Sequence, residues 1–132
     1  MHGAWGILRG IADISLFFVT FPDGLLGCTD GMSRIWLDKR LNSIEQRCTA
    51  MHELIHIENG HTGCQGARVE RRVREEAARR LIPLDQLAEA LAWTQSPAEL
   101  ADELHVTQQV IGDRLDGLTG SEREQLAAGL DH

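Results

Sequence analysis

Residues 52–56 read HELIH and match the pattern H-E-x-x-H, whose spacing has a chemical meaning on a helix. Residues four positions apart lie on one face of an α-helix, about one turn from each other, so the imidazoles of His52 and His56 can bind a single metal ion. Glu53, next to the first histidine, can then accept a proton from a water molecule bound to that ion. The segment therefore predicts a Zn²⁺ site in which His52 and His56 are ligands and Glu53 is the catalytic base.

The residues around this motif predict a buried helix. Asn42 followed three positions later by Glu45 is the pattern of a capping box, and Gly60 is typical of a helix end. Between these residues the segment is apolar on almost every side, as in a helix at the centre of a domain. The three polar side chains of the motif would then be buried, and a metal ion with its water would provide partners for all of them.

Composition excludes several classes of protein. With 132 residues and a hydrophobic fraction of 42%, we expect a soluble globular domain, alone or with a helical appendage. The net charge of −7 argues against nucleic acid or an anionic membrane as the main partner. Arg9 and Asp13 interrupt the N-terminal apolar stretch, so we expect neither a transmembrane helix nor a signal peptide. Cys28, Cys48 and Cys64 lack metal-type spacing among themselves and indicate reduced thiols in a cytoplasm.

The rest of the chain predicts an α+β fold with strands before the motif and helices after it. Residues 16–21 and 33–38 read as strands bounded by turns, which suggests a small antiparallel sheet packed on the motif helix. The strand at the free edge of that sheet could pair with an extended peptide, or it could be an edge strand that binds no peptide. The other expected helices span residues 4–12, 67–82 and 84–93, with one capped by Ser96 and two short ones after it, the last capped by Ser121.

A catalytic zinc needs a third protein ligand, and several residues are candidates. The helix over residues 67–82 has an inward face marked by apolar residues repeating every four positions, Val69, Val73, Ala77 and Leu81. Glu70 lies within this face, Glu76 lies at its margin, and Glu75 points the opposite way. Each of these glutamates also precedes an arginine by four residues, as in a solvated ion-pair face without a ligand. His61 and Cys64, in the preceding loop, are further candidates.

Taken together, the motifs resemble the ImmA/IrrE family of metallopeptidases, and its short actinobacterial and phage versions look closest. The resemblance covers roughly residues 20 to 118. It implies a minimal zincin-like domain and a zinc-dependent endopeptidase, several of whose relatives act beside phage or mobile-element repressors. The matching pieces are Gly27, residues 35–38, residues 47–56, Gly60-His61 and the helix end at residues 77–83.

The resemblance also bears on the third ligand and on the oxyanion. Family members often carry the ligand glutamate at the position of Arg72, and Glu76 is the nearest carboxylate on the same face of the helix. Glu76 also stands about twenty residues after the second histidine, a spacing that other zincins use. We therefore expect the metal ligands His52, His56 and Glu76, with Fe²⁺ or Mn²⁺ as alternatives to Zn²⁺. The chain has no tyrosine to stabilise an oxyanion, which leaves His61, His105 and Arg47 as candidates.

The C-terminal part predicts a helical extension of the catalytic domain. We place the zincin-like domain at residues 1–83 and the extension, packed on the same domain, at residues 84–132. Residues 98–111 resemble a helix-turn-helix. However, the segment from Ala98 to Leu118 contains five acidic residues and a single basic one, Arg114, and this negative net charge repels the phosphates of DNA. The extension is therefore interpreted as a structural cap or a docking surface for a protein.

Three functions remain open from the residues alone. The first is a zinc endopeptidase, a hydrolase that cleaves a regulatory protein such as a helix-turn-helix repressor of a phage or mobile element. The second is a metal-bound anti-repressor that acts by contact without turnover. The third is a helix-turn-helix DNA-binding regulator with a structural metal. The motif favours the first, with Glu53 moving the proton of the water to the leaving amine.

Overall fold

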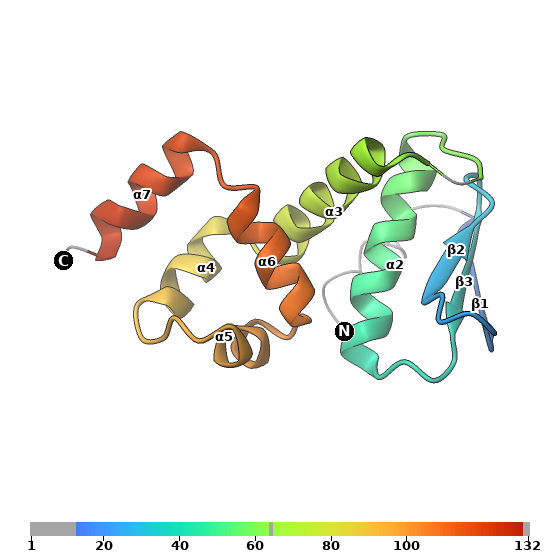
Figure 1. Ribbon diagram of the computed structural model, residues 1–132, viewed down its shortest axis with the longest axis horizontal. Coiled ribbons are helices and arrows are strands. Elements are labelled where there is room, and N and C mark those ends of the chain that lie inside the picture. The colour runs from blue at the N-terminus through green and yellow to red at the C-terminus, as the bar shows by residue number, and fades with distance from the viewer. Residues whose placement is uncertain (1–12, 64, 131–132) are drawn as a thin grey trace. The chain divides into compact units, whose positions relative to one another are not determined.

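The computed structural model describes residues 13–63 and 65–130 (Figure 1). The chain falls into two units, with the boundary between Val73 and Arg74. This boundary lies inside a helix, and the domain boundary expected after Pro83 stays a prediction. The helix expected over residues 4–12 lies outside the described residues. Within the described residues, no helix has both the length and the apolar composition that crossing a membrane requires.

The first unit contains a three-stranded mixed sheet, which confirms the α+β class. Its strands are β1 (Ser15–Val19), β2 (Gly27–Thr29) and β3 (Arg34–Asp38), in the order β1-β3-β2. β1 runs parallel to β3 and β2 runs antiparallel to it. The prediction of an antiparallel sheet was therefore wrong for β1. The chain reverses before and after the short strand β2, so the two strands that were predicted point in the same direction.

The turn between β2 and β3 is held by the side chain of Asp30. Its Oδ1 accepts hydrogen bonds from the backbone N–H groups of Met32, Ser33 and Arg34 at 2.8, 3.0 and 3.0 Å. These bonds stabilise the carboxylate and lower the pKa of Asp30 from its ordinary value. Gly31 completes the turn with a φ of +78°, in the left-handed region that favours glycine.

The motif lies on α2 (Ser43–Glu58), which packs against β2 and β3. The capping box is present as predicted: Glu45 N–H donates to Asn42 Oδ1 at 2.8 Å, and Asn42 N–H donates to Glu45 Oε1 at 2.9 Å. Ile35 and Leu37 of β3 are completely buried, so the sheet and the helix share one core. The apolar residues that α2 contributes to this core are Cys48, Ala50, Met51, Leu54 and Ile55.

After a loop, α3 (Ala67–Leu81) spans the boundary between the units, and four more helices complete the second unit. Arg114 is buried there, and its guanidinium donates to the carbonyl oxygen of Ile82 at 2.8 Å and to Glu122 at 3.0 Å. Ser96 caps its helix as predicted. The cap expected at Ser121 was wrong, because Thr119 accepts from Glu122 N–H instead. The helices are α4 (Leu84–Leu91), α5 (Pro97–Leu104), α6 (Gln108–Asp116) and α7 (Gly120–Leu130).

Candidate metal centre

The two histidines of the motif face a single carboxylate. His52 and His56 lie one turn apart on α2, with ring centroids 5.0 Å apart. Glu70 lies in the first turn of α3, and its Oε1 accepts hydrogen bonds from His52 Nε2 at 2.9 Å and from His56 Nε2 at 3.3 Å. Its Oε2 lies 2.9 Å from His56 Nε2. Each of the three residues offers one ligand atom, and these atoms all lie within 4.8 Å of one another. The cluster lies wholly within the first unit.

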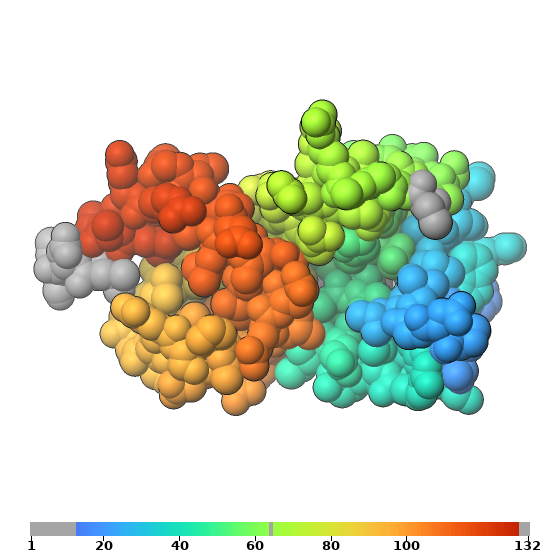
Figure 2. Space-filling model, in the orientation of Figure 1, coloured from blue at the N-terminus to red at the C-terminus, as the bar shows by residue number. Residues whose placement is uncertain are grey.

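This donor set fits a divalent metal ion. Two imidazole nitrogens and one carboxylate oxygen are the ligands of many catalytic zinc sites, which keep a fourth position open. The side chain of His56 is 8% exposed, whereas those of His52 and Glu70 are 24% and 31% exposed, so the centre is reached from the side of His52 and Glu70. In Figure 2, side chains of α2 (green) remain visible between α3 (yellow-green) and the strands (blue).

Glu53 is a buried carboxylate beside this cluster. Burial, and then the negative charge of Glu70, raise the pKa of Glu53 to about 7. Burial opposes the charged form of Glu70 too, but hydrogen bonds from His52 and the charge of His56 outweigh it, so the pKa of Glu70 is lowered. The two carboxyl groups thus have opposite tendencies. Glu70 stays charged, as a ligand must, and Glu53 exchanges a proton near neutral pH, as a general base must.

The family of the chain agrees with this geometry. The family model of the IrrE N-terminal-like domain, a peptidase family, matches residues 10–116. The chain belongs to this family. It is a family of metallopeptidases, and all the residues of the cluster lie within the matched range. No curated protein and no solved structure matches the chain significantly.

The third residue of the cluster is Glu70, whereas Glu76, the ligand expected from the sequence, is not part of it. The carboxylate of Glu76 accepts hydrogen bonds from Arg79 at 3.3 Å and Arg80 at 3.0 Å, as in the ion-pair alternative. Glu76 lies six positions after Glu70 on α3, which places the two residues about 9 Å apart along the helix axis. Only one of them can therefore serve a given metal position.

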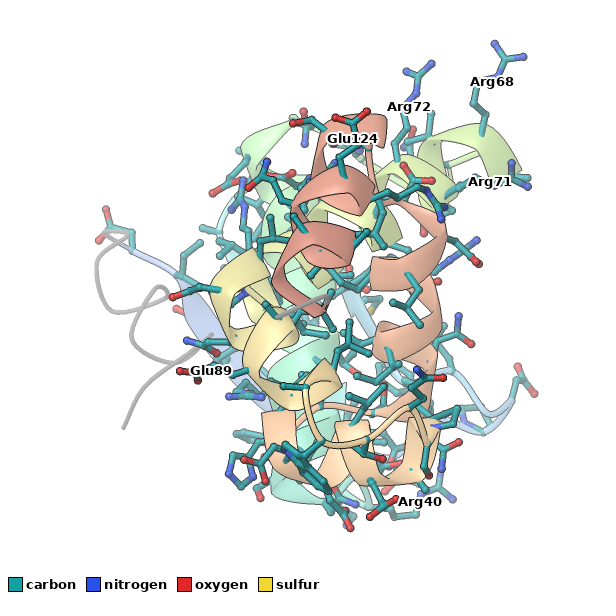
Figure 3. The ribbon with its side chains drawn as sticks, turned by 90° about the vertical axis from the view of Figure 1, so that its left-hand side faces the viewer. Arg40, Arg68, Arg71, Arg72, Glu89 and Glu124 are labelled. Atoms are coloured by element: carbon teal, nitrogen blue, oxygen red, sulfur yellow. The ribbon has the colours of Figure 1, made fainter. Side chains whose placement is uncertain are left out.

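The other candidates lie elsewhere. Arg72, the position at which the family resemblance implied a ligand, is exposed and points away from the protein (Figure 3). His61 contacts His56 from behind, at the nitrogen that does not face Glu70. Glu75 is not part of the cluster. Cys64 lies outside the described residues.

The raised pKa of Glu53 predicts a pH-dependent stability of the metal-free protein. The pKa is about 7 in the folded state against an ordinary value of 4.5, so the folded state binds the proton more tightly. The free energy of unfolding should then fall as pH rises from 4.5 to about 7 and stay low above it. Glu53→Gln should remove this loss, with a gain of up to about 3 kcal/mol at pH 8 and none at pH 4.

Urea unfolding of chelator-treated protein at the two pH values measures this difference. Glu124→Gln, at an exposed position of α7, is the control for removing a carboxylate. An equal effect of Glu53→Gln at both pH values would contradict the proposed burial of an ionisable group.

Proposed function

We propose that this protein is a zinc-dependent endopeptidase that hydrolyses a peptide bond of a regulatory protein. The observation that carries the proposal is the pairing of a three-residue cluster of possible metal ligands with the buried carboxyl group of Glu53, next to His52 on the same helix. A structural zinc site uses four protein ligands, whereas a catalytic site uses three and leaves one position for water and substrate. The cluster found among the described residues has three.

The roles of the residues follow from their positions. His52, His56 and Glu70 would hold the ion, and the ionised Glu70 would neutralise part of its charge. When bound, Zn²⁺ lowers the pKa of water and polarises the substrate carbonyl. Glu53 would accept the proton of the attacking water and donate it to the leaving amine.

The free edge of β2 supports a peptide as substrate. β2 is the last strand in the order β1-β3-β2, so within residues 13–63 and 65–130 one side of it has no neighbouring strand. β2 packs against α2, the helix that carries Glu53. Burial, and then the charge of Glu53, raise the pKa of Cys28 on β2. An extended segment paired with β2 would bring its backbone past Glu53. A helix-turn-helix repressor of a phage or mobile element is the substrate that the family resemblance favours.

Metal removal tests the proposal. Protein purified without a His tag should contain one divalent ion per chain, which a chelator removes. Hydrolysis of a mixture of labelled unstructured peptides should disappear with the ion and return with Zn²⁺. Hydrolysis that persists in the metal-free protein would overturn the metallopeptidase assignment, and so would the absence of stoichiometric metal binding. Fe²⁺ and Mn²⁺ added in place of Zn²⁺ show which ion supports the reaction.

A further inference from the structure

The ring of His61 lies directly behind the ring of His56. Their Nδ1 atoms are 3.0 Å apart, and their ring centroids are separated by 5.2 Å. The His56 nitrogen in this contact is opposite to the one that faces Glu70. We propose that His61 is a positioning residue of the metal centre, which sets the orientation of the His56 ring and the location of its proton. This inference rests on the proposed metal site and goes beyond it.

The end of α2 explains why these two rings meet. Gly60 has a φ of +68°, and its N–H donates to the carbonyl of Ile57 at 3.0 Å. The N–H of His61 donates to the carbonyl of His56 at 2.9 Å. This pair of bonds is a Schellman motif, which brings the residue after the glycine against the residue five positions earlier. That contact is usually apolar, and here it joins two imidazoles.

A second segment lies against the backbone of His61. Gly31, in the turn between β2 and β3, lies so close to the backbone carbonyl of His61 that a Cβ at this position would overlap it. Asp30 makes this turn rigid through its three backbone hydrogen bonds. His61 is therefore fixed by the end of α2 and by the sheet, as a residue that orients a ligand should be.

The proton arrangement explains why an imidazole suits this position. In the tautomer whose Nε2–H donates to Glu70, the Nδ1 of His56 accepts from His61. With Nε2 bound to an ion, His56 carries its proton on Nδ1 and must donate it. An imidazole at position 61 can serve as donor in the first state and as acceptor in the second. A lysine could only donate, and a carboxylate could only accept.

Zinc affinity measured by competition with a chromophoric chelator tests this role. His61→Leu keeps the volume and removes the polar contact, so the dissociation constant should rise by about 10- to 100-fold. His61→Asn should stay within about threefold of the wild type, because the amide places an acceptor near the position of Nδ1. Thr62→Ala, at the next, exposed position of the same loop, is the control and should have no effect.

Gly31→Ala extends the test without altering either ring. The added Cβ would push against the His61 backbone, so zinc affinity should fall in the same direction as for His61→Leu. Circular dichroism verifies that each metal-free variant is folded. The visible spectrum of the Co²⁺ protein reports the number of ligands and should be similar in the wild type and His61→Leu.

The possible failures are distinguishable. If the wild type binds zinc and His61→Leu binds it equally well, His61 has no positioning role and the proposed function stands. If the Co²⁺ spectrum of His61→Leu shows that a ligand has been lost, His61 is a ligand, which also overturns the positioning role. If the wild type binds no zinc, both the proposed function and this inference are wrong.

Discussion

Glu53→Gln should lower kcat for peptide hydrolysis by about 10²- to 10⁴-fold, the usual contribution of a general base. The amide keeps the size of the side chain but cannot take the proton of the attacking water. Because the three residues of the cluster are unchanged, the variant should still bind one Zn²⁺ per chain. Peptide cleavage and metal content, measured on the same preparation, give the two results together.

Glu58→Gln is the matched control, because it removes an exposed carboxylate five residues further along the same helix. It should leave both kcat and metal content unchanged. A zinc-loaded Glu53→Gln protein that keeps more than about a tenth of the wild-type kcat would show that Glu53 is not the base. If the variant is unable to cleave but still inactivates the regulatory partner fully, the protein acts by contact as an anti-repressor.

The same substitution should change stability in the opposite direction to activity. Burial holds the pKa of Glu53 near 7, so at neutral and higher pH the folded protein retains a carboxylate that would ionise more easily in the unfolded chain. A purely structural glutamate would lose stability when replaced. A gain in stability together with a loss of turnover is the combination expected for a residue held in place for chemistry.

Local rules were enough to predict the helix that carries the motif. The cap at Asn42 and Glu45 and the end at Gly60 are interactions within one helical turn, so the residues themselves specify them. The burial of α2 follows from its apolar composition on all sides. The position of the HELIH segment on a buried helix could therefore be predicted from the amino-acid sequence alone.

The strand β2 could not be predicted in the same way. It has three residues, Gly27–Thr29, which is too short for an alternating pattern and begins with a residue that strands disfavour. Its pairing with β3 is specified by the turn at Asp30 and Gly31 and by the cover that α2 provides. Without β2, β1 and β3 look like consecutive antiparallel strands, which is why the direction of β1 was wrong.

Predicting the third residue of the cluster requires the position of a side chain along the helix axis, which the periodicity of apolar residues does not give. A repeat of apolar residues gives the angle of a side chain around the helix. The position of that side chain along the helix axis, relative to the metal centre, depends on where the preceding loop lets the helix begin. Glu70 and Glu76 both lay near the inward face by angle. The loop after His61 is short, so the first turn of α3, which carries Glu70, lies beside the end of α2.

Glu70→Ala should therefore lower zinc affinity on the order of 10³-fold, because it removes one of the three proposed ligands. Glu76→Ala, on the same helix, should leave zinc affinity unchanged, because the carboxylate of Glu76 is held by Arg79 and Arg80. Competition with a chromophoric chelator measures both constants. Loss of zinc in Glu76→Ala with retention in Glu70→Ala would restore the ligand set expected from the spacing.

The size of the effect separates a ligand from a residue that positions one. Glu70 contacts both imidazoles at 2.9 Å, on the side where the ion would lie, whereas His61 contacts His56 only from behind. Removing Glu70 should therefore cost more affinity than removing the imidazole of His61, for which about 10- to 100-fold is expected. Glu70→Gln refines the comparison, because it keeps hydrogen bonding to the histidines and removes the charge. Its zinc affinity should be close to that of Glu70→Ala if charge neutralisation by Glu70, rather than orientation of the rings, holds the ion.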